Sequence, residues 1–287
     1  MSIKAMVRGK KLLSNAFAYA VLLALGVLWV LPIAYLVYTA FRENPSTGII
    51  NSLVPDNLRM GVGNFKTLFL DTMFPRWLWN TLLVSTCSCA LTTLFILMVS
   101  YALSRMRFKW RKPLVNVLLV LGMFPGFMSM IAIYFILKAM GLTNSLLALI
   151  LVYSGGAALS YYICKGFFDT VPKALEEAAW LDGANQPTIF WKIILPMAKP
   201  IIVYTVLTSF ISPWCDFIFV NTIISDRRLY TVALGLYKMI NAERNSFNDN
   251  FTVFCAGAFV VGGIIVSLFM SMQRYYVEGV TSGAVKG

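Results

Sequence analysis

Residues 169–196 read DTVPKALEEAAWLDGANQPTIFWKIILP, an amphipathic stretch that separates two long apolar runs. Asp169 or Thr170 is suited to cap a helix that has Pro172 in its first turn, and two glutamates favour its N-terminal half. Gly183 is placed to end this helix in a left-handed conformation. The first part of the stretch therefore predicts a short helix that ends at a glycine turn.

A second short helix is expected after the turn. It starts near Asn185 and Pro187, and Pro196 stops it. On the first helix, small Ala178 and Ala179 lie beside bulky residues, which gives a face suited to close approach by another surface. The structural alternative for this pattern is an amphipathic loop that lies against the membrane interface.

The composition indicates a chain dissolved mostly in lipid. Its 287 residues are 59% apolar and 13% charged, with a mean hydropathy of +0.75, whereas about a quarter of a soluble domain is charged. The net charge of +12 points first to loops held in the cytoplasm and only secondly to nucleic acid. The chain has no His, which excludes His-based acid–base catalysis and His metal sites. Its five Cys residues lie in or beside apolar stretches without a CxxC pair, so no redox or metal role is expected.

Six stretches are long and apolar enough to cross a bilayer core of roughly 30 Å as helices. The fifth is interrupted only by Asp216. The expected fold is therefore all-α and integral to the membrane, in one domain over residues 1–287, with loop 165–199 between the fourth and fifth spans. The spans are expected at residues 14–41, 77–104, 113–138, 142–164, 200–224 and 251–274.

An even number of spans puts both termini on one side, and the distribution of Lys and Arg decides which side. Most of these residues lie in the N-terminal segment, in the short loop 105–112, in loop 165–199 and in the C-terminal tail. Both termini are thus expected in the cytoplasm, and loops 42–76 and 226–250 outside. The first apolar run is far longer than the core of a signal peptide, so an uncleaved first span is expected.

The spacing within residues 169–196 resembles the EAA signature of importer permeases in the ATP-binding-cassette (ABC) superfamily. The matching positions are Glu177-Ala178-Ala179, Gly183, Ile193 and Leu195-Pro196. The likeness extends along the chain. Pro125 with residues 134–144 resembles the third span and outside turn of carbohydrate permeases, and residues 214–217 resemble their Trp-Asn-Asp/Glu-Phe segment, with Cys215 in place of Asn. Residues 279–287 resemble the tail of the maltose/maltodextrin-type permease subunit.

This resemblance implies a type I ABC importer permease fold, with six transmembrane helices and a cytoplasmic coupling helix, that carries a sugar, first of all maltose or maltodextrin, across the cell membrane. It also implies a heterodimer with a second permease subunit, two cytoplasmic ATPase subunits that bind ATP and Mg²⁺, and an external sugar-binding protein. Besides these, membrane lipid is a partner. The chain has no GxxxxGK[ST] loop, so it is expected to bind no cofactor and to be no enzyme. The residues expected to couple it to the ATPase are Glu176, Glu177, Ala178, Ala179, Asp182, Gly183, Ile193, Leu195 and Pro196.

The expected substrate path includes the carboxylate within the fifth span, because an intramembrane charge is costly and usually faces a polar cavity or a partner. An aromatic face beside polar groups is typical of sugar sites. The candidate residues are Trp214, Asp216, Tyr153, Gly155 and Gly156. The structural alternatives are a bond from Asp216 to a neighbouring helix or loop, close helix packing at the glycines, and an interfacial position for the tyrosine.

Two other classes of function are the alternatives from the residues themselves. An ion-coupled secondary transporter usually has internal repeats and several intramembrane ionisable groups, and a membrane enzyme needs clustered nucleophiles, metal ligands or paired carboxylates. The expected spans hold one acidic residue and no obvious repeat. Within the ABC resemblance, the alternative is an importer of another sugar or oligosaccharide, or of an amino acid, peptide or phosphate.

Overall fold

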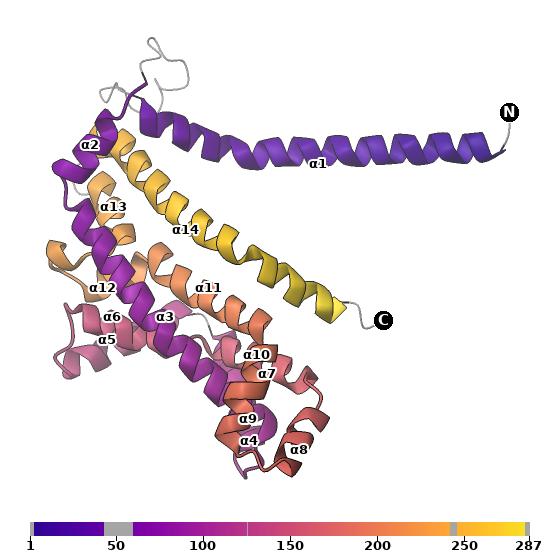
Figure 1. Ribbon diagram of the computed structural model, residues 1–287. Coiled ribbons are helices and arrows are strands. Elements are labelled where there is room, and N and C mark those ends of the chain that lie inside the picture. The colour runs from indigo at the N-terminus through magenta and orange to yellow at the C-terminus, as the bar shows by residue number, and fades with distance from the viewer. Residues whose placement is uncertain (1–2, 43–59, 125, 242–245, 285–287) are drawn as a thin grey trace. The chain divides into compact units, whose positions relative to one another are not determined.

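The computed structural model describes residues 3–42, 60–124, 126–241 and 246–284. Residues 43–59 of the expected outside loop 42–76, residues 242–245 of loop 226–250, Pro125 and the end of the tail lie outside this described part. The described residues form helices, turns and one isolated bridge, without a β-strand among them, which confirms the all-α expectation (Figure 1). The chain divides into two compact units, Met1–Thr72 with Met239–Val260 and Met73–Lys238 with Val261–Gly287.

The first unit contains α1 (Ile3–Phe41), α2 (Gly63–Leu70) and the first part of α14 (Ser246–Ala284). Asn64 ties the start of α2 to the end of α1, since its side-chain amide donates to the carbonyls of Ala40 (3.0 Å) and Arg42 (2.7 Å). Three aromatic rings pack together in this unit: Phe41, Phe65 and Phe259.

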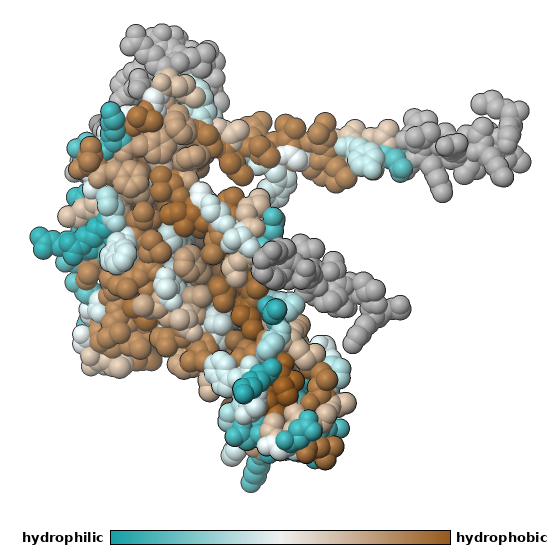
Figure 2. Space-filling view, viewed as in Figure 1, coloured by the Kyte–Doolittle hydropathy of each residue, from teal (hydrophilic) through white to brown (hydrophobic). Residues whose placement is uncertain are grey.

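The apolar side chains of α1 are largely exposed, including those of Leu23 (72%) and Trp29 (78%). Figure 2 shows residues 15–41 of this helix as mostly hydrophobic. Exposed apolar surface of this length is unfavourable in water and is solvated by the hydrocarbon of a bilayer. The exposure of α1 therefore agrees with an integral membrane protein.

The second unit is organised around α3 (Phe74–Arg105), which contacts α6 (Leu146–Ser154), α7 (Ala158–Thr170) and α11 (Lys199–Cys215). Its α3 contributes to two apolar clusters, through Val84 to one and through Tyr101 to the other. The other named helices of the chain are α4 (Arg111–Met123), α5 (Gly126–Ala139), α8 (Ala174–Leu181), α9 (Gln186–Ile189), α10 (Leu195–Met197), α12 (Ile218–Ile223) and α13 (Val232–Asn241).

Four helical segments are long and apolar enough to cross a membrane: Asn15–Phe41, Phe74–Arg105, Leu146–Thr170 and Asn250–Gln273. Two bent pairs pass the same test if each pair counts as one span: Arg111–Met123 with Met128–Ala139, and Gln186–Met197 with Lys199–Cys215. The described part of the chain thus holds four to six candidate spans, as a multi-pass membrane protein requires.

The expected fifth span, 200–224, is broken. Its first helix ends at Cys215, because the backbone of Asp216 is extended there, and the chain becomes helical again in α12 after Phe217. The expected third span, 113–138, is likewise divided between α4 and α5. Apolar composition predicted both segments but not their breaks.

The fourth span is displaced along the sequence. It covers Leu146–Thr170 in place of 142–164. Before it, Gly141 (φ 68°) and Asn144 (φ 59°) adopt left-handed conformations that no helix continues through. Ser145 then caps α6 by accepting a hydrogen bond from the amide of Leu147 (3.1 Å).

Asparagine side chains fix the turns at the end of the second unit where α3 begins. The side-chain oxygen of Asn144 accepts from the amides of Ser225 (3.0 Å) and Asp226 (2.9 Å). Asn80 of α3 donates to two carbonyls of the segment 228–230, both at 2.9 Å. The turn that resembles the carbohydrate-permease pattern therefore has a structural role, because it joins α6 to the segment after α12.

Candidate functional site

The helix–turn–helix expected in residues 169–196 is present as α8 and α9. Gly183 lies between them with φ 81°, in the left-handed region, and a Cβ atom there meets nothing within 4 Å. Glycine is therefore required by backbone conformation and not by crowding. The side chain of Asn185 caps α9 by accepting a hydrogen bond from the amide of Thr188 (3.0 Å).

The two ends of this segment differ from the prediction. Asp169 and Thr170 do not cap the first helix but belong to α7, and Lys173 precedes α8 as its N-cap. Asp169 instead accepts hydrogen bonds from Ser104 (2.6 Å) and Lys165 (2.6 Å), which holds it in the preceding helix.

Pro196 does not stop the second helix either. A π-helical turn, Phe190–Ile194, precedes α10, and the chain stays helical to Met197 before it bends by 83° into α11. The wider turn accommodates Pro196, which lacks an N–H to donate and whose ring is crowded in a regular α-helix. Ile193 and Leu195 of this turn are half-buried, whereas Pro196 is exposed.

The C-terminal end of α3 contacts residues 171–197, called the coupling segment below. Arg105 Nε lies 2.8 Å from Glu176 Oε1 of α8, and the two side chains are only 3% and 5% exposed. Arg105 Nη2 also donates to the carbonyl of Val171 at 2.6 Å. Tyr101 donates its hydroxyl to Gln186 Oε1 of α9 at 3.1 Å. Arg105 and Tyr101, together called the α3 clamp below, thus hold both sides of the glycine turn.

Burial and the neighbouring Arg105 shift the pKa of the Glu176 carboxyl in opposite directions. Burial raises the pKa of its carboxyl group, and the Arg105 guanidinium lowers it by a smaller amount, so the net pKa lies above the ordinary value for glutamate. Ala179 of α8 and Ile189 of α9 belong to one buried apolar cluster with Tyr101 of α3.

The opposite face of α8 is open. Glu177, Ala178, Asp182 and Gly183 are exposed, whereas Glu176 and Ala179 face the interior. Two large apolar side chains are also exposed on this short helix, Trp180 (50%) and Leu181 (90%). The predicted coupling residues therefore divide into an exposed set and a set that fixes the helix to α3. Leu181, one of the bulky residues expected beside Ala178 and Ala179, is the most exposed large apolar residue of the segment.

The predicted path residues lie at two helix breaks, Trp214 and Asp216 at the break between α11 and α12 and the others at or beside the break between α6 and α7. Asp216 accepts hydrogen bonds through both carboxylate oxygens, from the hydroxyl of Tyr153 (2.9 Å) and from the amide of Phe219 (2.9 Å). It thereby caps α12 and joins it to α6, which is the structural alternative noted above. Trp214 is 3% exposed and its ring packs beside that of Phe210, with centroids 5.8 Å apart.

Gly155 and Gly156 lie at the break between α6 and α7. Gly156 has φ 65°, and a Cβ atom there would lie 3.1 Å from Thr92 Cγ2 and 3.2 Å from Ile96 Cδ1. Its backbone thus approaches α3 closely. Thr92 donates its hydroxyl to the carbonyl of Tyr153 (2.9 Å), a carbonyl next to the break.

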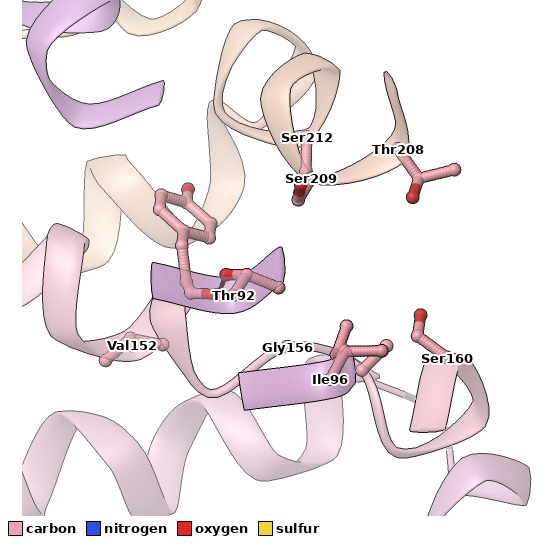
Figure 3. A pocket seen from close by; sticks show the side chains of 10 residues that line it. Thr92, Ile96, Val152, Gly156, Ser160, Thr208, Ser209 and Ser212 are labelled. Atoms are coloured by element: carbon pink, nitrogen blue, oxygen red, sulfur yellow. Dashed lines mark hydrogen bonds between the residues drawn. The ribbon is translucent and has the colours of Figure 1, made fainter. Parts of the chain in front are cut away.

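A cavity of about 280 Å³ opens between α3, the α6–α7 break and α11. Figure 3 shows Thr208, Ser209 and Ser212 on one side of it and Ser160 on the other, where Gly156 and Ile96 also lie. We call it the hydroxyl cavity; its lining residues are Thr92, Ile96, Val152, Tyr153, Gly156, Ala157, Ser160, Thr208, Ser209 and Ser212.

Sequence reasoning found Tyr153 and Gly156 of this cavity but not its hydroxyls. A signal was present, because Thr208, Ser209 and Ser212 are spaced to share one face of a helix. The other two hydroxyls, of Thr92 and Ser160, come from distant parts of the chain and join the cavity only through the fold. Trp214 and Asp216 do not line it.

Comparison with known proteins adds independent information. Residues 93–276 match the family described as binding-protein-dependent transport system inner membrane component. The maltodextrin transport system permease protein MalD of Streptococcus pneumoniae is 32% identical over 280 residues, covering 97% of this chain and 98% of the relative. The galactooligosaccharides transport system permease protein GanQ of Bacillus subtilis is 32% identical over 276 residues, covering 94% and 95%. A solved bacterial ABC transporter that imports the acidic polysaccharide alginate has a similar fold, with a TM-score of 0.75, 20% identity and coverage of 96% and 99%.

Proposed function

Since this chain belongs to the family of binding-protein-dependent transport system inner membrane components, we propose that it is the permease subunit of an ATP-driven importer of maltose or maltodextrin. The structural observation that carries the proposal is the exposed face of α8, with Trp180 and Leu181, on a helix that a buried ion pair fixes to α3. A short helix that exposes large apolar side chains and is itself rigidly held suits the docking of a partner protein.

Each bent helix pair counts as one span in this proposal, so the chain crosses the membrane six times as one permease domain. Both termini and α8 lie in the cytoplasm, because the basic loop 105–112 and loop 165–199 then lie inside. Loops 42–76 and 226–250 face the outside, where they meet a sugar-binding protein.

The importer is completed by other chains. A second permease subunit forms a heterodimer with this one, and two cytoplasmic ATPase subunits bind ATP and Mg²⁺. Glu177, Ala178, Asp182 and Gly183 contact an ATPase groove through the exposed side of α8. Closure of the ATPase pair moves the coupling segment, and the α3 clamp passes this movement to α3 because the buried contacts do not stretch.

Maltodextrin is the first choice of substrate because the likeness to the maltodextrin permease covers almost the whole of both chains. A galactooligosaccharide is the second candidate, because the relative of that name is equally similar at 32% identity. The path for either sugar passes the region of Tyr153, Gly155, Gly156, Trp214 and Asp216, in which Asp216 acts by holding α6 to α12.

The test is sugar-stimulated ATP hydrolysis by the assembled importer in liposomes, with the partner permease, ATPase and binding protein. Stimulation by maltotriose supports the substrate; stimulation by a galactooligosaccharide alone replaces it with the second candidate. Uptake by this chain alone, driven by an ion gradient without ATP, would contradict the function.

Gly183 provides the matched variants for the coupling role. Gly183→Leu strains the left-handed turn, whereas Gly183→Asn is tolerated because asparagine adopts this conformation more readily. Gly183→Leu is expected to lose most of the sugar-stimulated ATPase activity and Gly183→Asn to retain most of it. Equal, unchanged activity in both variants would refute the role of the turn.

A further inference from the structure

We propose that the hydroxyl cavity is a binding site on this subunit for one ring of the uncharged sugar chain during its passage. The inference rests on the proposed function and deepens it, since it assigns sugar contact to this chain and not only to its partner permease.

The lining has the chemistry that a sugar requires. Five of its lining residues carry aliphatic hydroxyl groups, the others are Tyr153, Gly156 and three apolar residues, and none is charged. The hydroxyl of Tyr153 is engaged, because it donates to Asp216 outside the lining. A charged solute finds no counter-charge there, so desolvation disfavours it. An uncharged polyol replaces its lost water contacts with hydroxyl partners and lays its C–H faces on Ile96 and Val152.

The hydroxyls keep their capacity for a ligand. Thr92, Thr208 and Ser209 donate to backbone carbonyls, at 2.9, 2.9 and 2.6 Å, which leaves their oxygen lone pairs for incoming donors. Within the described part of the chain, the hydroxyls of Ser160 and Ser212 have no hydrogen-bond partner. They can both donate and accept, as the hydroxyls of a sugar do.

On α11, the hydroxyl groups that line the cavity are exposed to it, whereas another hydroxyl of the same helix is buried and bonds only to the helix backbone. Thr205, one turn earlier, is 2% exposed and bonds only within its helix, to the carbonyl of Ile201 (2.8 Å). Thr208 and Ser212 are exposed on the cavity side. In Figure 3 the hydroxyls of Thr208 and Ser160 point into the same gap from two different helices.

The size of the cavity limits what it holds. Its volume of about 280 Å³ lies near the lower end of the roughly 300–1,000 Å³ typical of ligand sites. It therefore accepts one ring of a chain and not a whole oligosaccharide. Gly156 leaves no room for a side chain on this wall, because an added Cβ atom would lie 3.1 Å from Thr92 Cγ2 and 3.2 Å from Ile96 Cδ1.

The first test measures access and protection with single cysteines. Ser160→Cys and Ser212→Cys are made in a chain whose five native cysteines are replaced by serine or alanine, and the assembled importer is treated with a water-soluble thiol reagent. Both sites are expected to react, and saturating maltotriose is expected to slow the reaction at least about fivefold. Gluconate, a charged polyol, is expected not to protect. Thr205→Cys is the buried control and is expected to stay unmodified.

The second test removes hydroxyls while keeping the volume. Thr208→Val with Ser212→Ala is expected to reduce maltotriose uptake about three- to tenfold, as the loss of one or two sugar hydrogen bonds would. The control is Ser267→Ala on α14, an exposed serine that bonds its own helix at Gly263 (2.7 Å) and lines no part of the cavity; its uptake is expected to stay unchanged.

The outcomes separate this inference from the function itself. Normal uptake by the double variant, or modification that maltotriose does not slow, overturns the cavity site while the importer function stands. Unreactive cysteines at both positions in an active importer also overturn it, because the partner permease then fills the cavity. Absence of uptake in the unmodified importer contradicts the proposed function before the cavity is tested.

Discussion

The ion pair between Arg105 and Glu176 is the contact whose removal should most affect the coupling segment. Both side chains are at least 95% buried, so the loss of one partner leaves a charge without compensation in an apolar site. Breaking such a pair costs about 3–5 kcal/mol. Arg105→Met is expected to reach this range, because it also removes the hydrogen bond to the carbonyl of Val171. Glu176→Gln keeps a hydrogen-bond acceptor but leaves the buried Arg105 guanidinium without its counter-charge, so it is also expected to cost about 3–5 kcal/mol.

Amide hydrogen exchange of α8 measures this effect directly, because it reports the free energy of local opening. Arg105→Met is expected to speed exchange of α8 about 100-fold or more. Lys165→Met is the control: it breaks the pair with Asp169 (2.6 Å), whose carboxylate is 42% exposed, and exposed pairs contribute about 1 kcal/mol at most.

The double variant Arg105→Met with Glu176→Leu separates the pair from its surroundings. It is expected to be less destabilised than Arg105→Met alone, because no unpaired charge is left buried. Exchange of α8 in Arg105→Met that matches the Lys165→Met control would refute the clamp.

Three further results follow from the contacts. Burial raises the pKa of the Glu176 carboxyl, so folding favours its neutral form. This contribution to stability is complete below the ordinary glutamate pKa of about 4.3 and is lost as the pH rises through the raised value. Amides of α8 should therefore exchange more slowly near pH 4 than at pH 8, after correction for the intrinsic pH dependence of exchange, and Glu176→Gln should abolish this difference. Gly235→Ala should destabilise the detergent-purified chain in thermal unfolding by about 1–3 kcal/mol or more, because the added Cβ atom would lie 2.1 Å from the ring of buried Trp77. The control Gly263→Ala, whose Cβ atom would meet nothing within 4 Å, should be neutral or stabilising in the same measurement. Asp216→Asn should retain sugar uptake, because asparagine still accepts the hydrogen bond from the amide of Phe219 that caps α12. Asp216→Ala removes this acceptor and should lower the free energy of unfolding by about 0.5–2 kcal/mol. Loss of uptake in Asp216→Asn at normal stability would favour a direct role of the carboxylate in the path.

Local sequence rules predicted the features that depend on neighbouring residues. The glycine turn at Gly183 and the start of the second helix near Asn185 were both predicted correctly, because backbone conformation and helix initiation depend on residues within one turn of helix. Apolar run length likewise located the membrane segments. The start of α8 was misplaced because Asp169 and Thr170 remain in α7, where contacts with α3 decide their position.

Features that depend on distant residues were not predictable in this way. Nothing near Glu176 in the sequence indicates that Arg105 is its partner. The break at Asp216 required knowledge that Tyr153 and the amide of Phe219 satisfy its carboxylate. Apolar composition alone favours a continuous helix there, and tertiary hydrogen bonds override it.

The cavity and the coupling segment are connected through shared helices. Helix α3 carries Thr92 at the cavity and Arg105 at the clamp, about 20 Å apart along a helix of 1.5 Å rise per residue. Helix α11, which carries Thr208 and Ser212, begins at the bend that ends the coupling segment. Two walls of the cavity therefore end at the surface proposed to bind the ATPase. If the clamp transmits a displacement of α8 to α3, the distance between α3 and α11 must change unless these two helices move as one body. ATP-driven movement would therefore alter sugar contact at the hydroxyl cavity, which lies between them.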